Sequence, residues 1–350
     1  MVTEQEYKVC VRCATYNHVN YITDAMNGFV MQETNFPFVC TIVDDASTDG
    51  EQTVIKKYLE DGFELSDASV AYEKDEDYGH VIYARHKANQ NCFFAVVLLN
   101  ENNYSQRKLK SPYFMGWMEN AKYVAFCEGD DYWIDPLKLQ KQVDILEADE
   151  TLMAVVANSK VVSKEGDELV SKQKNVVPDN KQGRYDLRSF IHNVHHYPTA
   201  TVCYRRTHDD DIANMKKIMS NSYLGDWTLW IALHIFGDFY YIDQVMSAYR
   251  INPASVTHTV DRVGRAKANW MISKSVLEVL PSEYADLRKD LMDKSWMWEE
   301  LGFAYKSQRK YLRMAGCFLL SFVNNPRNTV KSFRKRLKSK NDDDYRKTKV

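Results

Sequence analysis

The fold is decided by residues 38–49, FVCTIVDDASTD, read together with residues 7–17, YKVCVRCATYN. Each stretch is an apolar run of strand length that ends in polar residues, a pattern typical of strands buried on both faces of a sheet. Between the two runs, apolar side chains recur with helical spacing from Ile22 to Val30. The order strand, helix, strand predicts a parallel pair joined by a right-handed crossover.

The same alternation continues further along the chain. The spacing Thr48-x-x-Glu51 predicts a capping box that opens a second helix. Apolar runs at residues 93–99 and 123–127 predict two more buried strands. We therefore expect an α/β fold, with a doubly wound, mostly parallel, Rossmann-like sheet.

Beyond about residue 150 the alternation becomes less regular, and from about residue 262 the sequence is helical throughout. We predict one domain over residues 1–260, made of halves at about 1–135 and 136–260. A helical appendage with a basic tail is expected over residues 261–350.

Composition excludes several classes of protein. The formal net charge of −2 gives no global field that would recruit nucleic acid. Cys10 and Cys13 form a C-x-x-C, but they lie on a strand, where they point to opposite faces, and no second pair has zinc spacing. No signal peptide is visible in the first residues, and no stretch of about 18 apolar residues predicts a membrane span. Together these features favour a cytoplasmic protein that binds no nucleic acid.

Polar clusters follow four of the predicted strands, at residues 15–17, 44–45, 102–106 and 128–131. The carboxyl ends of parallel strands meet at one edge of a sheet, where open α/β sheets bind their ligands. We therefore expect the four clusters to form one site.

The cluster at residues 128–131 is acidic. Glu128, Asp130 and Asp131 would repel one another unless a cation neutralised them, and hard oxygen ligands suit Mg²⁺ or Mn²⁺ bound to phosphate. The alternative is a solvated acidic turn. The apolar strand before the cluster and the pair Tyr132 and Trp133 after it argue against full solvation.

Asp44 and Asp45 leave two interpretations open. A carboxylate at a strand end accepts a hydrogen bond from the imide N–H of uracil or thymine. The pair also resembles a phosphoacceptor cluster, but a receiver domain would carry acidic residues after its first strand, where this chain has Thr-Tyr-Asn. Helix capping by residues 47–49 does not account for the two aspartates.

These motifs together resemble family 2 glycosyltransferases of the GT-A fold, over roughly residues 7–255. The resemblance rests on Thr-Tyr-Asn, on Val-Asp-Asp-Ala-Ser-Thr-Asp, and on Glu-Gly-Asp-Asp-Tyr-Trp before Asp-Pro-x-Lys-Leu. It implies an inverting enzyme of the bacterial polysaccharide type. The implied donor is a UDP- or dTDP-sugar, the cofactor Mn²⁺ or Mg²⁺, and the acceptor a glycan or lipid-linked glycan.

The resemblance also implies roles for individual residues. Asp130 and Asp131 correspond to the metal-binding pair. Glu128 stands where the family usually has Asp, and its longer side chain leaves a contact to ribose open. The family's segment Asn-x-Gly…Ala-Arg-Asn is altered here, and the segment after residue 101 takes its place. Arg107 then corresponds to the family's arginine, and Arg85 is the alternative candidate. The implied donor nucleotide site comprises Thr15, Tyr16, Asn17, Asp44, Asp45, Asn103, Ser105, Arg107, Glu128 and Asp130.

The family's general base is an Asp at the start of a helix about a hundred residues beyond the metal motif. Asp226 fits this position, although Gly225 replaces the usual Glu, and an N-cap role is the alternative. Trp133, His196 and Trp227 are expected to line the acceptor site.

Two other functions remain open. A sugar-phosphate nucleotidyltransferase would want a glycine-rich basic loop after the first strand, which Thr15 to His18 do not provide. A nucleotide-binding scaffold of a polysaccharide assembly complex would not need Asp226.

The carboxyl-terminal region raises the possibility of a membrane contact. Residues 311–323 form an apolar-rich stretch, and basic residues crowd positions 331–340, which attracts anionic lipid at the inner face of the membrane. The alternative is a packed helix with a solvated tail, which the acidic residues 342–344 favour.

Overall fold

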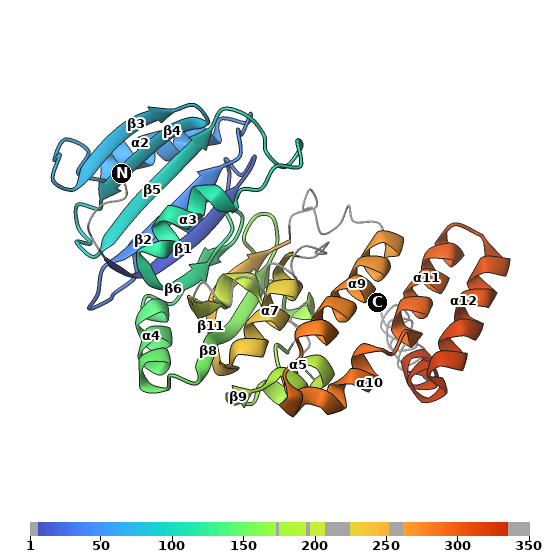
Figure 1. Ribbon diagram of the computed structural model, residues 1–350. Helices are drawn as coiled ribbons and strands as arrows, with labels where there is room; N and C mark the ends of the chain where they lie inside the picture. Colours follow the sequence, from blue (N-terminus) through green and yellow to red (C-terminus); the bar gives the residue numbers. More distant parts are fainter. Residues whose placement is uncertain (1–5, 173–174, 194–196, 207–224, 252–261, 335–350) are drawn as a thin grey trace. The chain divides into compact units, whose positions relative to one another are not determined.

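The computed structural model describes residues 6–172, 175–193, 197–206, 225–251 and 262–334. The chain divides into two compact units (Figure 1). The first comprises Met1–His208 and Phe236–Pro253, and the second comprises Asp209–Ile235 and Ala254–Val350. The domain predicted over residues 1–260 therefore draws on both units, and its boundary stays a prediction.

Four parallel strands form the centre of the first unit. Their spatial order is β5-β2-β1-β6. Strands β2 and then β5 are added on one side of β1, and β6 pairs with β1 on its other side. The predicted doubly wound, mostly parallel sheet is confirmed. The strands are β1 (Tyr7–Thr15), β2 (Phe38–Asp44), β5 (Cys92–Leu99) and β6 (Ala121–Phe126).

Further strands extend the sheet on both sides, giving the full order β3-β4-β5-β2-β1-β6-β10-β8-β11-β7. Their pairings are antiparallel except that of β8 with β11, which is parallel. The hairpin of β3 and β4 was not predicted, because β3 is mostly exposed and charged and so lacks a strand's apolar signal. The added strands are β3 (Ala71–Glu76), β4 (Gly79–Arg85), β7 (Tyr132–Trp133), β8 (Leu152–Val162), β9 (Gly183–Tyr185, paired with β11), β10 (Cys203–Arg205) and β11 (Asp238–Arg250).

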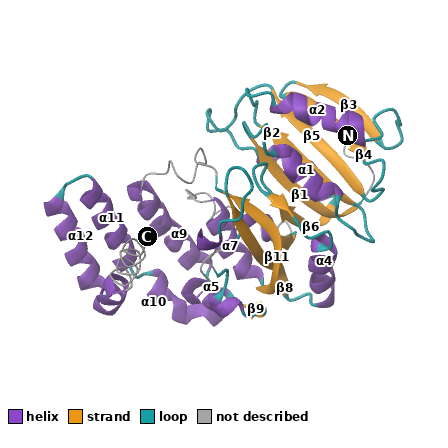
Figure 2. Ribbon diagram, turned by 180° about the vertical axis from the view of Figure 1, so that it is seen from behind, coloured by secondary structure: helices purple, strands orange, loops and turns teal. Residues whose placement is uncertain are grey.

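Helices cover both faces of this sheet. Figure 1 shows α3 in front of the sheet, and Figure 2, from behind, shows α1 and α2 on the opposite face. The alternation along β1 explains this arrangement, because Cys10 packs towards α3 whereas Cys13 packs towards α1 and α2. The helices and turns are α1 (Ile22–Val30), α2 (Glu51–Gly62), α3 (Ser111–Glu119), α4 (Lys138–Ala148), η1 (Val170–Lys172), η2 (Pro178–Asn180), α5 (Leu187–Asn193) and η3 (Thr199–Thr201).

The predicted capping box is wrong. Helix α2 begins at Glu51 itself, after an N-cap at Gly50 whose φ of 96° favours glycine. The first N–H of the helix donates to Asp49 Oδ1 (3.1 Å), not to Thr48. The side chain of Glu51 instead reaches the loop after β1.

The second unit is helical, as expected for the carboxyl-terminal region. Its core is made by α11 packed against α9 and α12, with Met297, Leu301 and Cys317 buried between them. None of the helices within the described ranges is long and apolar enough to cross a membrane. The elements are α7 (Gly225–Phe236, whose last residue belongs to the first unit), α9 (Arg262–Val279), η4 (Ser282–Leu287), α10 (Arg288–Leu291), α11 (Ser295–Ser307) and α12 (Tyr311–Asn324).

A lysine lies in the core of the first unit. Lys138 is 0% exposed, donates a hydrogen bond to Gln142 Oε1 (2.7 Å) and places its Nζ 4.2 Å from the centre of the Trp133 ring. Burial lowers the pKa of this ammonium to about 8. In the unfolded chain the same group titrates near its ordinary value of about 10.4.

This difference predicts a pH-dependent stability. Between about pH 8 and 10 the unfolded state binds more protons at Lys138 than the folded state, so this residue's contribution to stability rises with pH. The unfolding free energy of wild type minus that of Lys138→Met should therefore increase over this range, by up to about 1.4 kcal/mol per pH unit. Urea unfolding at several pH values measures it. The exposed control Lys56→Met should give a flat difference, and an equally flat difference for Lys138→Met would refute the prediction.

Candidate active site

The site lies at the carboxyl ends of β1, β2, β5 and β6. Strand order reverses between β1 and β6, and open α/β sheets bind ligands at such a switch point. Backbone hydrogen bonds continue the sheet into the loops here: the N–H groups of Cys127 and Gly129 donate to the carbonyls of Arg12 and Ala14, each at 3.1 Å. The acidic loop after β6 is thereby held beside the end of β1.

The loop after β1 presents three predicted donor-site residues. Thr15 is buried, whereas Tyr16 and Asn17 are exposed. Asn17 has a positive φ of 56° and links this loop to the one after β2, because its N–H donates to Ser47 Oγ and its Oδ1 accepts from the N–H of Thr48 (both 2.8 Å). The first two polar clusters therefore form one connected surface.

The side chain of Glu51 joins these two loops. Its buried carboxylate accepts the hydroxyl of Thr15, the backbone N–H of His18 (2.8 Å) and the hydroxyl of Ser47 (2.8 Å). Burial raises the pKa of this carboxyl above its usual range. The sequence analysis missed this role because Glu51 also fits the capping-box pattern.

Asp44 and Asp45 are both fully buried but differ in their partners. Oδ1 of Asp44 accepts from the N–H of Ser47 (3.0 Å) and from Gln52 Nε2 (2.6 Å). Its Oδ2 is buried and has no hydrogen-bond partner among the residues that the structure describes. The two oxygens of Asp45 accept the backbone N–H groups of Asn103 (2.8 Å) and Tyr104 (3.1 Å). Asp45 thus anchors the loop after β5 to the end of β2.

That anchored loop carries the third cluster. Asn103 is buried and donates to the Tyr113 hydroxyl (3.0 Å), whereas Ser105 and Arg107 are exposed. The rival Arg85 pairs with Glu64 and lies opposite Phe93, near the start of β5. Arg85 therefore lies at the opposite end of the strands from the site, so of these two arginines Arg107 alone is on the side of the site.

The acidic loop approaches β1 closely. A Cβ on Gly129 would lie 2.1 Å from Thr15 Oγ1, so only glycine fits at this position. Asp130 is partly exposed and its Oδ2 lies 3.7 Å from Nε2 of His18, while Nδ1 of His18 lies 3.2 Å from Thr15 Oγ1. His18 was not predicted as a site residue, although it directly follows Thr-Tyr-Asn in the sequence.

Asp131 is buried, whereas its neighbour Asp130 is partly exposed. Burial, and then the charges of Asp130 and Glu128, raise the pKa of Asp131 well above the usual range, and its Oδ1 accepts the backbone N–H of Arg250 (2.9 Å). Among the residues that the structure describes, no group of three or more His, Cys, Asp or Glu side chains is arranged to hold a metal ion. Mg²⁺ commonly takes only one or two protein carboxylates and completes its shell with substrate phosphates and water. Partly exposed Asp130 fits that limited role.

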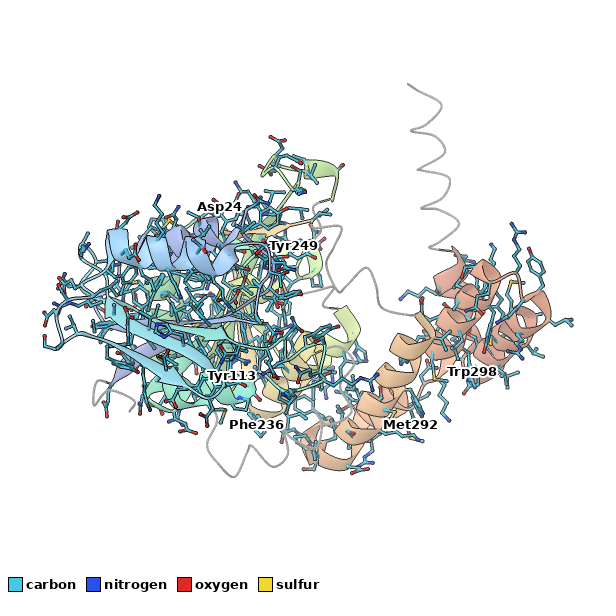
Figure 3. The ribbon with its side chains drawn as sticks, turned by 90° about the horizontal axis from the view of Figure 1, so that it is seen from above. Asp24, Tyr113, Phe236, Tyr249, Met292 and Trp298 are labelled. Atoms are coloured by element: carbon cyan, nitrogen blue, oxygen red, sulfur yellow. The ribbon has the colours of Figure 1, made fainter. Side chains whose placement is uncertain are left out.

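Arg250, at the end of β11, fastens the acidic loop to the rest of the unit. Its nearly buried guanidinium donates to the carbonyls of Asp130 and Lys164 (both 3.0 Å) and pairs with Asp24 Oδ2 (2.7 Å). Figure 3 shows the labelled Asp24 close to Tyr249, the neighbour of Arg250. Arg250 therefore connects the acidic loop, helix α1 and the turn after β8.

Of the three predicted acceptor residues, the structure describes the side chain of Trp133 alone. Trp133 is 1% exposed and donates its Nε1–H to the carbonyl of Ala200 (2.7 Å), a core position that leaves no ring face for a sugar. His196 lies outside the described residues. Asp226 and Trp227 lie in the first turn of α7, but their side chains are also outside the described part of the chain.

Sequence comparison finds distant relatives. No family model matches the sequence. The uncharacterized proteins Rv1520 of Mycobacterium tuberculosis and Mb1547 of Mycobacterium bovis are each 28% identical over 254 residues, which is 70% of this chain. The match spans 59% of the length of these relatives.

Comparison of structures identifies the fold. S. aureus TarS 1-349 in complex with UDP-GlcNAc matches 94% of this chain and 92% of its own, with a TM-score of 0.56 and 15% identity. The mannosyltransferase PcManGT from Pyrobaculum calidifontis, in complex with GDP-Man and Mn²⁺, matches 94% of this chain and 84% of its own, with a TM-score of 0.52 and 14% identity. The chain thus has a fold shared with these glycosyltransferase structures.

The contact between Gly129 and Thr15 gives a direct test of the site's geometry. In Gly129→Ala the new methyl group would overlap Thr15 Oγ1, so the acidic loop must shift. Overpacking of this kind costs about 1–3 kcal/mol of unfolding free energy, which urea unfolding measures. The control Gly316→Ala meets no atom within 4 Å and should not be destabilised. If both variants were as stable as wild type, the acidic loop would not lie against β1.

Proposed function

We propose that this chain transfers a sugar from a UDP- or dTDP-sugar to a hydroxyl group of a glycan or lipid-linked glycan. The observation that carries the proposal is the convergence of four polar loops at the switch point of a fold shared with glycosyltransferases. TarS in complex with UDP-GlcNAc and PcManGT with GDP-Man and Mn²⁺ support a nucleotide-sugar donor. In this proposal the chain is a hexosyl- or hexosaminyltransferase of the inverting, family 2 type.

The nucleoside is assigned to the loops after β1, β2 and β5. Thr15 and Asp45, with Asp44, are proposed to read a pyrimidine, and Tyr16, Asn17, Asn103, Ser105 and Arg107 to line the nucleotide around it. Each oxygen of a carboxylate accepts two hydrogen bonds, so Asp45 retains acceptor capacity beyond its bonds to the loop after β5. The buried Oδ2 of Asp44, which has no partner in the described part of the chain, is a second acceptor in this region.

The diphosphate is assigned to the acidic loop. Glu128, Asp130 and Asp131 lie at the end of β6, and a divalent cation would neutralise both these carboxylates and the phosphates. We propose Asp130 as the direct protein ligand of Mn²⁺ or Mg²⁺, with Asp131 assisting, and Glu128 as a contact to ribose or metal. The bound cation would stabilise the charge that develops on the leaving diphosphate.

The residues around Asp130 have separate tasks in this proposal. His18 lies beside Asp130 and is oriented by Thr15 and Glu51, so it helps to position that carboxylate. Arg250 holds the backbone of the acidic loop through the carbonyl of Asp130 and the carboxylate of Asp131. Both residues hold the loop in place before the donor binds.

If Asp130 binds the metal ion, the affinity for a nucleotide diphosphate should depend on that ion, and calorimetry measures this affinity. Asp130→Asn removes the charge of the proposed ligand and should weaken nucleotide diphosphate binding in Mn²⁺ by at least about tenfold. EDTA should weaken binding to wild type in the same way. The control Asp144→Asn changes an exposed carboxylate on α4 and should bind as wild type does. Equal affinity of wild type in Mn²⁺ and in EDTA would disprove the metal assignment.

The general base is proposed from sequence position. Asp226 would take the proton of the acceptor hydroxyl as its oxygen forms a bond to the anomeric carbon. The bond from that carbon to the diphosphate breaks at the same time, and its electron pair leaves on the phosphate oxygen. A single displacement of this kind inverts the anomeric centre.

Replacing this base should separate turnover from binding. Asp226→Asn should reduce turnover by about 10²–10⁴-fold and keep nucleotide affinity, since only the transition state requires the proton transfer. A nucleotide-release assay with a panel of nucleotide sugars measures turnover, and NMR of the product measures inversion. The control Asp61→Asn should retain wild-type activity. Wild-type turnover by Asp226→Asn would assign the base to another residue, and nucleotide binding with no turnover by any form would favour the scaffold alternative.

A further inference from the structure

Helix α12 exposes an apolar face. Cys317 packs against α11, and buried Ser321 bonds the Thr329 hydroxyl (2.8 Å). Leu312, Leu319 and Val323, spaced by seven and four residues, share the opposite face of the helix. These three side chains are 92%, 64% and 68% exposed. Helix α12 has apolar side chains both towards α11 and on its exposed face. An exposed apolar helix face of this kind is suited to bind an apolar partner surface.

The same segment is basic. Residues 309–334 contain no Asp or Glu but contain Arg309, Lys310, Arg313, Arg327, Lys331 and Arg334. Residues 326–334 are helical and follow α12 directly. Together with the end of α12 they line a groove of about 510 Å³, in which Phe322, Pro326 and Val330 lie beside the cations of Arg327, Lys331 and Arg334.

We propose that this surface, formed by α12 and residues 325–334, docks on an anionic phospholipid membrane. The apolar face would enter the boundary between headgroups and acyl chains, and the cations would contact lipid phosphates. At 14 residues, α12 is about 21 Å long, which suits a helix lying in the interface rather than one crossing a hydrocarbon core of about 30 Å.

A second copy of the chain is the other occupant that an apolar face could have. A twofold interface would place the same surface on both partners, so the basic residues of one copy would face those of the other. Residues 309–334 carry six cations and no carboxylate. The carboxylates that adjoin this segment, Asp293 and buried Glu299, already accept hydrogen bonds from Asn325, Asn328 and Ser332, so they offset only part of the repulsion. Charge complementarity therefore favours anionic lipid. The proposal does not depend on the chemistry assigned to the first unit.

Co-sedimentation of the full chain with vesicles tests the proposal. Wild type should sediment with phosphatidylcholine vesicles that contain phosphatidylglycerol and bind pure phosphatidylcholine much more weakly. Leu319→Gln and Val323→Gln should each weaken binding by about tenfold through lost apolar burial. Arg327→Gln and Lys331→Gln should each weaken it by about fivefold, and added salt should reduce the contribution of the cations.

Matched variants on the first unit serve as controls. Val170→Gln removes an equally exposed apolar side chain, and Lys57→Gln removes an exposed cation; both should bind vesicles as wild type does. Wild type that stays in the supernatant with anionic vesicles at low salt would overturn the proposal. So would Leu319→Gln and Val323→Gln proteins that sediment like wild type, because the apolar face would then not enter the membrane. Light scattering that showed a dimer lost in these variants, with vesicle binding unchanged, would assign the face to a second copy.

Discussion

The parallel pairing of β1 with β6 is the constraint on which the site depends. This pairing aligns Val11 with Ala125 and Arg12 with Phe126, and it continues as backbone hydrogen bonds from Cys127 and Gly129 to β1. Because the sheet reverses its strand order here, the loop after β1 and the acidic loop emerge side by side from neighbouring strands. Gly129 permits the close contact, since any side chain there would meet Thr15.

The loops at this edge bury acidic groups at an energetic cost. Asp44, Asp45, Glu51 and Asp131 are all buried, and burial raises the pKa values of Glu51 and Asp131. Hydrogen bonds from backbone N–H groups offset part of this cost at Asp45, Glu51 and Asp131. A buried carboxylate cluster that is only partly compensated is typical of a binding site rather than of a core built for stability. The proposed divalent cation would offset part of the remaining cost at Asp131.

The central strands were predictable because their signal is local. An apolar run that ends in Thr15 or in Asp44 marks both the strand and the polar edge where it ends. The β3–β4 hairpin has no such signal, because its edge strand is charged. The full length of β11 could not be predicted, since irregular pairing after Ile242 lets polar residues interrupt its apolar pattern.

Contacts made across long distances in the sequence could not be predicted. Glu51 fits a capping pattern, yet its carboxylate joins Thr15 and His18, more than 30 residues earlier. Trp133 follows the acidic motif directly, but its ring turns into the core beside Lys138. Arg250 reaches Asp130 and Asp24 only because β11 ends next to the acidic loop.

Titration calorimetry in the presence of Mn²⁺ tests most directly whether the switch-point crevice binds a pyrimidine nucleotide. UDP, dTDP, GDP and ADP would be compared with the full chain under the same conditions. The account predicts that UDP or dTDP binds at least about tenfold more tightly than either purine nucleotide, since loss of a hydrogen bond to a buried acceptor costs about 1–3 kcal/mol. Equal affinity for all four nucleotides, or binding of none, would contradict it.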